Sequence, residues 1–153
     1  MPQFFNLSKS IKILKNLLIP QSDKSKDKKI YVTREDSSYR KIINEADIVP
    51  ILRSKGYKVI NPQLYNIDEQ IKIFSQADKI ISPHGSNLSN IIFCKPGTEV
   101  YEIGPTFKNE YEKVFENRYM YLAKINNIRY TRFLADTVPV DKHSDIAKKY
   151  INK

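Results

Sequence analysis

Residues 78–94, with the sequence DKIISPHGSNLSNIIFC, constrain the fold of this chain more than any other stretch. The apolar run at 79–82 is too short for a helix, so it predicts a strand. Gly85 permits a tight turn because it has no Cβ, and Ser86 or Asn87 can then cap a helix. The apolar side of that helix consists of Leu88, Ile91, Ile92 and Cys94.

The start of such a helix is suited to binding an anion. Its first backbone N–H groups have no partner within the helix, and the helix dipole adds partial positive charge at the same end. Here the helix start also follows the end of a strand, an arrangement that binds phosphate groups in many proteins. We therefore expect a phosphate-bearing ligand near His84 and Gly85.

The rest of the chain alternates between strand and helix patterns. Strands are predicted at 29–33, 57–61, 79–82, 98–103 and 128–134. Helices are predicted around Ile42, Ile43, Ala46, Val49 and Leu52, from a capping box at Asn66 and Glu69, and at 109–125 and 141–151. This alternation predicts right-handed crossovers and a parallel sheet. The expected class is a Rossmann-like α/β fold, an open parallel sheet with helices on both faces.

The first 29 residues are predicted to form a separate segment ahead of a Rossmann-like domain at 30–153. Apolar residues from Leu7 to Leu18 recur at helical spacing, so 8–19 reads as an amphipathic helix with lysines on its other side. Residues 21–29 form a charged linker. The helix packs on this domain or on a neighbouring lobe, or, as an alternative, it lies in a membrane interface.

The net charge of +9 makes polyanions and anionic membranes possible partners. Residues 1–30 hold seven lysines and two acidic residues, so the remainder of the chain carries only +4. Cys94 is the one cysteine, predicted to be a buried space-filler, and no apolar run is long enough to span a membrane. We expect a cytoplasmic protein, with peripheral membrane contact as a weaker alternative.

Two arginines follow the first predicted strand, where ligands bind to open parallel sheets. The guanidinium groups of Arg34 and Arg40 can each grip phosphate oxygens through paired N–H donors. The alternative is that they form surface ion pairs with Glu35, Asp36 or Glu45.

Other polar residues also lie near predicted strand ends. His84 can bond a phosphate, accept a proton or cap a strand. Glu102 is placed to accept hydrogen bonds from ribose or sugar hydroxyls, or to form an ion pair. Asn90 can cap the helix or bond to the loop, and Asn44 and Gln70 are similarly ambiguous.

Several common catalytic motifs are missing from the sequence. Two separated histidines and one cysteine give no metal-ligand spacing, and no Asp-x-Asp pair is present to hold a divalent ion against a diphosphate. The glycine-rich dinucleotide fingerprint, the P-loop and the nucleophile elbow are also absent. Ordinary dehydrogenases, P-loop NTPases and serine hydrolases are therefore disfavoured.

A series of short motifs between Ile30 and Ile103, and more loosely to Tyr130, resembles glycosyltransferase family 61. That family includes bacterial capsular-polysaccharide proteins and eukaryotic xylosyl- and N-acetylglucosaminyltransferases. The ensemble is specific, although no single motif is. In order, the motifs are Thr33-Arg34, Arg40, Asn44-Glu45, Gly56-Tyr57, Glu69-Gln70-Ile71, Ala77, His84-Gly85-Ser86-Asn87-Leu88-Ser89-Asn90 and Glu102-Ile103.

The resemblance implies a two-lobed fold of the B type, whose C-terminal lobe holds a nucleotide sugar without a metal or other cofactor. It implies transfer of the sugar, with inversion, to a hydroxyl of a glycan acceptor. His84 is then the candidate catalytic base, unless it binds the donor instead. The implied donor-binding residues are Arg34, Arg40, His84, Gly85, Ser86, Asn87, Asn90 and Glu102.

The chain departs from the family pattern at two points, and two other functions are alternatives to sugar transfer. Family members often have alanine at the position of Ser86, and they carry a further lobe ahead of the matched region. This chain has about thirty residues there, so we expect the acceptor side to come from a separate lobe or from self-association. The alternatives are a basic module that binds nucleic acid or another polyanion through Lys9 to Lys29, without sequence specificity, and a folded remnant that serves only in interactions.

Overall fold

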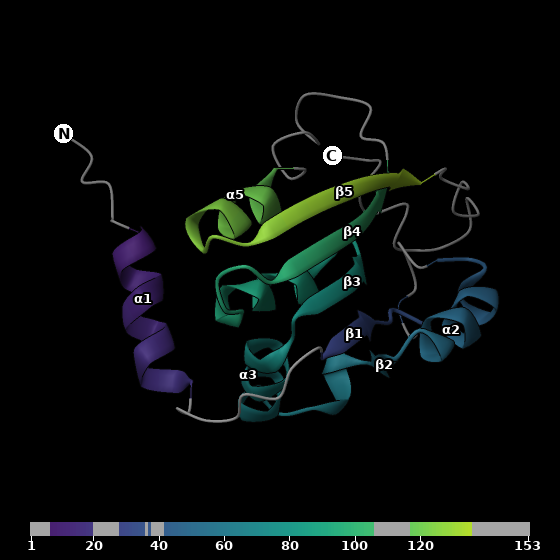
Figure 1. The fold of residues 1–153 in the computed structure, drawn as a ribbon, viewed down its shortest axis with the longest axis horizontal. Coiled ribbons are helices and arrows are strands. Elements are labelled where there is room, and N and C mark those ends of the chain that lie inside the picture. Colours follow the sequence, from purple (N-terminus) through teal and green to yellow (C-terminus); the bar gives the residue numbers. More distant parts are fainter. Residues whose placement is uncertain (1–6, 20–27, 36, 38–41, 106–116, 136–153) are drawn as a thin grey trace, which may run out of the picture.

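Five parallel strands form one sheet in the computed structural model of the chain (Figure 1). The order across the sheet is β2-β1-β3-β4-β5, which confirms the predicted Rossmann-like α/β class. The structure describes residues 7–19, 28–35, 37, 42–105 and 117–135. The strands are β1 Lys29–Val32, β2 Tyr57–Ile60, β3 Lys79–Pro83, β4 Glu99–Pro105 and β5 Arg129–Ala135.

The described helices alternate with these strands as the sequence predicts. They are α1 Leu7–Leu18, α2 Glu45–Ser54, η1 Pro62–Leu64, α3 Ile67–Gln76, η2 Ser86–Phe93 and α5 Arg118–Ile125, where η denotes a 3₁₀ helix. The capping box at α3 is confirmed, because Glu69 N donates to Asn66 Oδ1 and Asn66 N donates to Glu69 Oε2, both at 2.9 Å. The predicted helix at 141–151 and Arg40 lie outside the described residues.

One face of the sheet packs on η2, α3 and α5 to form the core. Side chains of alternate strand residues point into it, as expected of a pleated strand. On the strands these core residues are Ile30, Val32, Ile60, Ile80, Val100 and Tyr130, and from the helices Ile71, Phe74, Leu88, Ile91, Tyr119 and Ala123 join them.

Tyr31 points to the opposite face, which α2 covers at the β1 side. The Tyr31 hydroxyl donates to Glu45 Oε1 of α2 at 2.6 Å, and both residues are buried. Farther along this face, Tyr101 and Phe133 stack with ring centroids 6.2 Å apart, and Phe133 is 54% exposed. Helices therefore lie on both faces of the sheet, as predicted.

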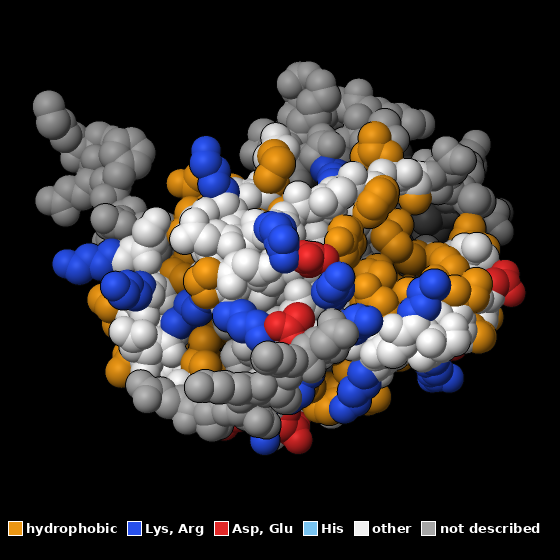
Figure 2. Space-filling model, in the orientation of Figure 1, with side chains coloured by type: hydrophobic (Ala, Val, Ile, Leu, Met, Phe, Trp, Pro, Cys, Tyr) orange, Lys and Arg blue, Asp and Glu red, His pale blue; other side chains and the backbone are white. Residues whose placement is uncertain are grey.

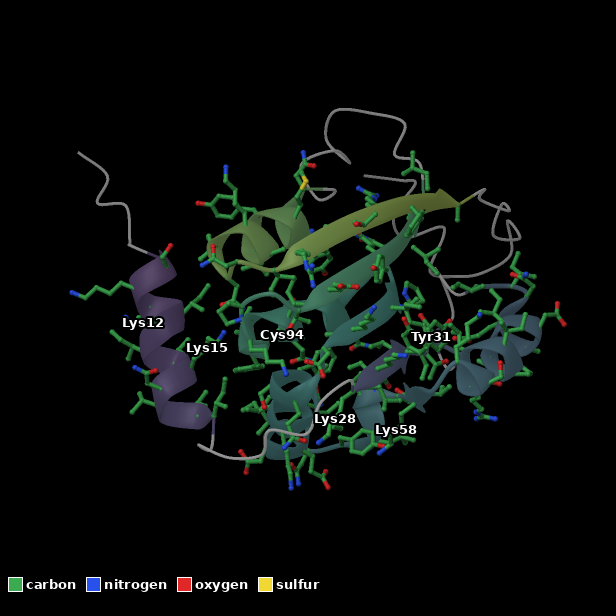
Figure 3. All side chains as sticks on the ribbon, viewed as in Figure 1. Lys12, Lys15, Lys28, Tyr31, Lys58 and Cys94 are labelled. Atoms are coloured by element: carbon green, nitrogen blue, oxygen red, sulfur yellow. The ribbon has the colours of Figure 1, made fainter. Side chains whose placement is uncertain are left out.

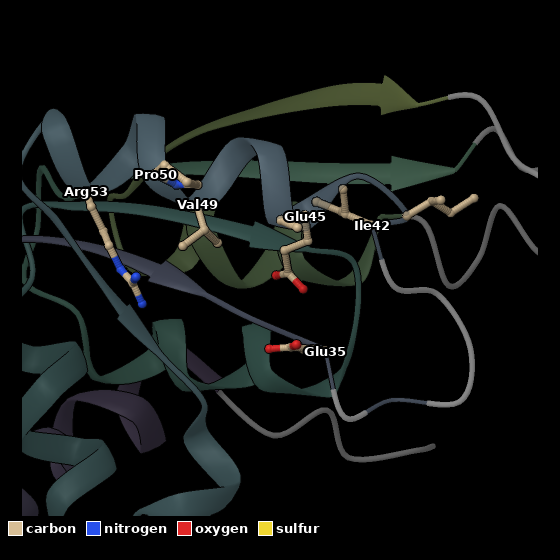
Figure 4. A pocket seen from close by; sticks show the side chains of 8 residues that line it. Glu35, Ile42, Glu45, Val49, Pro50 and Arg53 are labelled. Carbon is tan, nitrogen blue, oxygen red and sulfur yellow. The ribbon is translucent and has the colours of Figure 1, made fainter.

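The orientation of α2 differs from the prediction made from its apolar residues. Of the five residues expected on its core side, only Leu52 is buried, and Ile43 is 72% exposed. Glu45 points to the sheet instead, because its carboxylate accepts the hydrogen bond of Tyr31. The expected core residues Ile42, Ile43, Ala46 and Val49 line a hollow of about 440 Å³, together with Glu35, Glu45, Pro50 and Arg53 (Figure 4).

The helix predicted after Gly85 is present but is a 3₁₀ helix. Gly85 occupies the N-cap position and no side chain caps the helix, so the predicted caps at Ser86 and Asn87 are wrong. A 3₁₀ helix has three residues per turn, and Leu88, Ile91 and Cys94, each three residues apart, are all buried. This spacing fits a 3₁₀ helix, and it also occurs on the apolar side of an α-helix.

Helix α1 packs on the sheet domain beside the amino ends of the strands (Figure 1). Ile11 is buried, and Lys15 donates to the Cys94 carbonyl and, at 3.0 Å, to Asn126 Oδ1 (Figure 3). Lys15 was expected on the solvent side, so this part of the prediction is wrong. Burial lowers the pKa of the Lys15 ammonium. Leu17, expected on the apolar stripe, is 76% exposed.

Candidate functional site

His84 and Glu102 form a buried pair at the carboxyl edge of the sheet. His84 directly follows β3, and its backbone N–H donates to the carbonyl of Ile103 on β4 at 2.8 Å. The ring nitrogen Nδ1 is hydrogen-bonded to Glu102 Oε1. Since His84 is 3% exposed and Glu102 is fully buried, the carboxylate fixes the ring at the strand ends.

Two residues of β5 complete the surroundings of Glu102. The Tyr130 hydroxyl donates to Glu102 Oε2, and Arg132 Nε lies 3.6 Å from the same oxygen. The parallel register places Arg132 beside Glu102 and Tyr130 beside Val100, so both side chains share the buried face. We refer to His84, Glu102, Tyr130 and Arg132 as the Glu102 network.

The chemistry of Tyr130 is set by this environment. Burial, and then the hydrogen bond to Glu102, raise the pKa of the Tyr130 phenol well above its usual range. The phenol therefore stays protonated and acts as the donor. On the other side, the His84 ring packs edge-to-face on Tyr119 of α5, with ring centroids 5.4 Å apart.

Arg34 lies directly over Gly85. A Cβ on Gly85 would come within 2.7 Å of Arg34 Cζ and closer still to Nη1. Nη2 of Arg34 also donates to Ser37 Oγ at 3.1 Å. Gly85 has φ 163°, which is extended backbone that other residues also adopt. The prediction that a tight turn requires glycine here is therefore wrong. Glycine leaves room for the guanidinium group.

Arg132 and Gly104 repeat this arrangement on the other side of His84 and Glu102. A Cβ on Gly104 would meet Arg132 Nε at 2.9 Å. Arg132 Nη2 donates to the carbonyl of Pro105 at 3.1 Å. Two guanidinium groups, each packed on a glycine, thus flank His84 and Glu102 along the carboxyl edge.

The remaining predicted site residues are dispersed. Ser86 is exposed and Asn87 is half-buried at the start of η2. Asn90 Nδ2 donates to Gln70 Oε1 at 3.0 Å, and Gln70 Nε2 donates to the carbonyls of Pro62 at 2.9 Å and Tyr65 at 3.0 Å. Asn90 and Gln70 therefore hold η2 on α3. Asn44 is exposed at the start of α2 and makes no side-chain cap.

Glu102 was expected to accept hydrogen bonds from sugar hydroxyls, but its carboxylate has other partners in the structure. Both carboxylate oxygens bond to side chains of the protein, and no part of the residue is exposed. This placement favours an action of Glu102 through His84.

Tyr130 and Arg132 were not predicted as site residues. Their spacing of two along the last strand was a usable signal, because it puts both side chains on one face of that strand. The neighbouring strand and its register were unknown, so the face could not be assigned to Glu102.

Neither a metal cluster nor a membrane span is found in the part of the chain that the structure describes. No three His, Cys, Asp or Glu side chains there are grouped so that they could hold a metal ion. None of its helices is both long and apolar enough to cross a membrane. Cys94 is fully buried, and burial raises the pKa of its thiol to about 12, which confirms a space-filling residue.

The fold and the candidate site together define a Rossmann-like α/β domain, with polar side chains gathered at the carboxyl ends of parallel strands. Residues 2–101 match the family model described as Glycosyltransferase 61. The chain belongs to this family. The match also covers α1, which precedes the motifs on which the resemblance to the family was based.

The chain is also similar to the EGF domain-specific O-linked N-acetylglucosamine transferase of Gallus gallus. The two are 30% identical over 112 residues, which cover 69% of this chain and 20% of the relative. The chain therefore spans about a fifth of the length of that curated relative.

Proposed function

We propose that this chain is the donor-binding lobe of a glycosyltransferase, which transfers a sugar from a nucleotide sugar to an acceptor hydroxyl. The observation that carries the proposal is that Arg34, packed on Gly85, lies next to the Glu102 network at the carboxyl edge of a family 61 domain. Transfer proceeds by one displacement at the anomeric carbon, with inversion and without a metal.

The leaving group is a nucleoside diphosphate, whose growing negative charge must be stabilised. Arg34 is the residue for this task, because a guanidinium group donates paired hydrogen bonds to phosphate oxygens. The backbone N–H groups at the start of η2, near Ser86 and Asn87, add further donors. Gly85, the N-cap residue of η2, leaves room for the guanidinium group beside the start of this helix.

His84 meets the ligand through Nε2 in this proposal, because Nδ1 is engaged by Glu102. From that position it bonds the donor or takes the proton of the acceptor hydroxyl. The acceptor glycan binds on the opposite side of the site. A separate lobe, or a second copy of the chain, supplies that side, which agrees with the relative being about five times the length of the matched region.

Calorimetric titration with UDP, GDP and their sugar nucleotides in EDTA tests the proposal. We expect binding of at least one of them, weakened by Arg34→Ala. The control is Arg53→Ala, which changes an arginine in the hollow beside α2 and leaves Gly85 and His84 untouched. If none of the nucleotides binds, the donor-lobe proposal is wrong, and if binding requires a divalent ion, its metal-independent part is wrong.

Polyanion binding is a second candidate, favoured by the charge of +9. Figure 2 shows basic side chains over α1 and much of the viewed face, interspersed with acidic and apolar ones. Binding of a short RNA that falls steeply with salt and survives His84→Ala would support this function. Its absence at low salt would exclude it. The cytoplasmic location stays a prediction.

A further inference from the structure

We propose that Tyr130 and Arg132 of β5 are positioning residues that hold Glu102 so that it keeps His84 in the Nδ1–H tautomer. This inference deepens the proposed function and rests on it, since the purpose of the arrangement is to present Nε2 of His84 to the donor or acceptor. The tautomer of His84 and the roles of Tyr130 and Arg132 are tested without a nucleotide.

The hydrogen bonds of the Glu102 network leave a limited set of proton positions. The Tyr130 phenol stays protonated, because its pKa is raised, and its hydroxyl donates to Glu102 Oε2. Oε1 then either accepts Nδ1–H of His84 or carries a proton that it donates to Nδ1. The first arrangement has an ionised Glu102, and the second has a neutral one with the proton of His84 on Nε2.

Arg132 brings a positive charge next to the carboxylate of Glu102. Its Nε lies 3.6 Å from Glu102 Oε2, and the Arg132 side chain is only 14% exposed. A positive charge held this close in a buried setting attracts the negative charge of a carboxylate, which is the form of Glu102 that the proposal assigns. An ionised Glu102 can only accept, so His84 Nδ1 must donate, and in the neutral imidazole the lone pair then resides on Nε2.

The position of the Arg132 guanidinium group depends on the backbone of β4, the neighbouring strand. A Cβ on residue 104 would come within 2.9 Å of Arg132 Nε and Nη2, so glycine at this position leaves room for the guanidinium group beside Glu102. The same group is fixed by its bond to the Pro105 carbonyl. Tyr130 and Arg132 therefore approach Glu102 from one strand, and Tyr119 closes the other side of the His84 ring.

The tautomer of His84 can be measured directly in the chain as it stands. The protein has two histidines, His84 and His143, so a long-range ¹H–¹⁵N spectrum of the labelled chain contains two imidazole patterns. Substituting His143→Gln assigns them. At pH 7.5 we expect His84 to show the Nδ1–H pattern, whereas a free imidazole favours Nε2–H. An Nε2–H pattern for His84 in the unsubstituted protein would overturn the proposal.

The variants Tyr130→Phe and Arg132→Gln test the positioning role, with Tyr121→Phe as the matched control on an exposed tyrosine. We expect either network variant to lose the exclusive Nδ1–H pattern and the control to keep it. A folded Tyr130→Phe and a folded Arg132→Gln that both keep it would refute the role of β5. If neither variant folds, the pattern of the unsubstituted chain still decides the tautomer.

The outcome is independent of donor binding. If no nucleotide binds while His84 shows the Nδ1–H pattern and the variants change it, the donor-lobe proposal fails and the positioning network stands. If nucleotides bind and His84 shows the Nε2–H pattern, the positioning proposal fails and the donor-lobe proposal stands.

Discussion

Substituting Gly85→Ala is expected to weaken nucleotide binding much more than it weakens the fold. The new Cβ would lie 2.7 Å from Arg34 Cζ and nearer still to Nη1, so the guanidinium group has to leave its place. The backbone at residue 85 is extended, with φ 163°, a conformation that alanine adopts without strain. The displaced atoms belong to the far end of a flexible side chain, so rearrangement costs roughly 0.5–1.5 kcal/mol of stability.

The loss in affinity is expected to be larger. A hydrogen bond to a charged group contributes about 1.5–3 kcal/mol, and about 1.4 kcal/mol corresponds to tenfold in Kd. Displacing Arg34 should therefore weaken binding of a nucleoside diphosphate by roughly 10- to 100-fold. Calorimetry gives the affinity, and thermal unfolding gives the stability of the same samples.

Gly97→Ala is the matched control. Gly97 has φ +84° and open space around its Cβ position, so alanine there is strained but touches nothing. We expect it to destabilise the fold by about 1–2 kcal/mol and to leave affinity unchanged. A Gly85→Ala protein that binds nucleotide as tightly as the unsubstituted chain would refute the reasoning about Arg34.

Three further predictions concern stability and reactivity. The Cys94 thiol, with its pKa raised to about 12, should react with a disulfide reagent at pH 8 only after unfolding, and rapid reaction of the folded protein would contradict its burial. Lys15→Ala should lower the free energy of unfolding by about 1–3 kcal/mol, because it removes the donor to the Cys94 carbonyl and Asn126, while exposed Lys12→Ala should have no measurable effect. Equal effects of the two lysine variants would contradict the anchoring of α1. Burial raises the phenol pKa of Tyr31 and Tyr130, so the stability they contribute is complete below pH 10 and is lost as the pH rises above it, by about 1.4 kcal/mol per pH unit for each. Urea unfolding at pH 9 to 11 measures this slope, and Phe variants that keep the full slope would refute it.

The position of His84 and Glu102 was predictable because it depends on short-range patterns. The order of strands and helices implied a parallel sheet, and a parallel sheet brings the carboxyl ends of its strands to one edge. Both residues follow or end predicted strands, so their approach required no knowledge of the side-chain packing. The same reasoning placed Arg34 near them.

The orientation of α2 shows where pattern reasoning failed. Periodicity assumes that apolar residues face the core, and it assigned Ile42, Ile43, Ala46 and Val49 to that side. The hydroxyl of Tyr31, buried on the sheet, requires an acceptor, and Glu45 provides it. Because an unsatisfied buried hydroxyl is costly, the polar pair determines which side of the helix faces the sheet.

The sequence by itself determined the class of fold, the family and the edge of the sheet where the candidate site lies, because local patterns of apolar, turn and capping residues repeat without reference to distant parts of the chain. Only the tertiary structure decided what surrounds Glu102. Tyr130 and Arg132 are 28 and 30 residues away, and they reach it through the register of β4 with β5. That register, and the space that Gly85 and Gly104 leave for two guanidinium groups, depend on packing between distant segments.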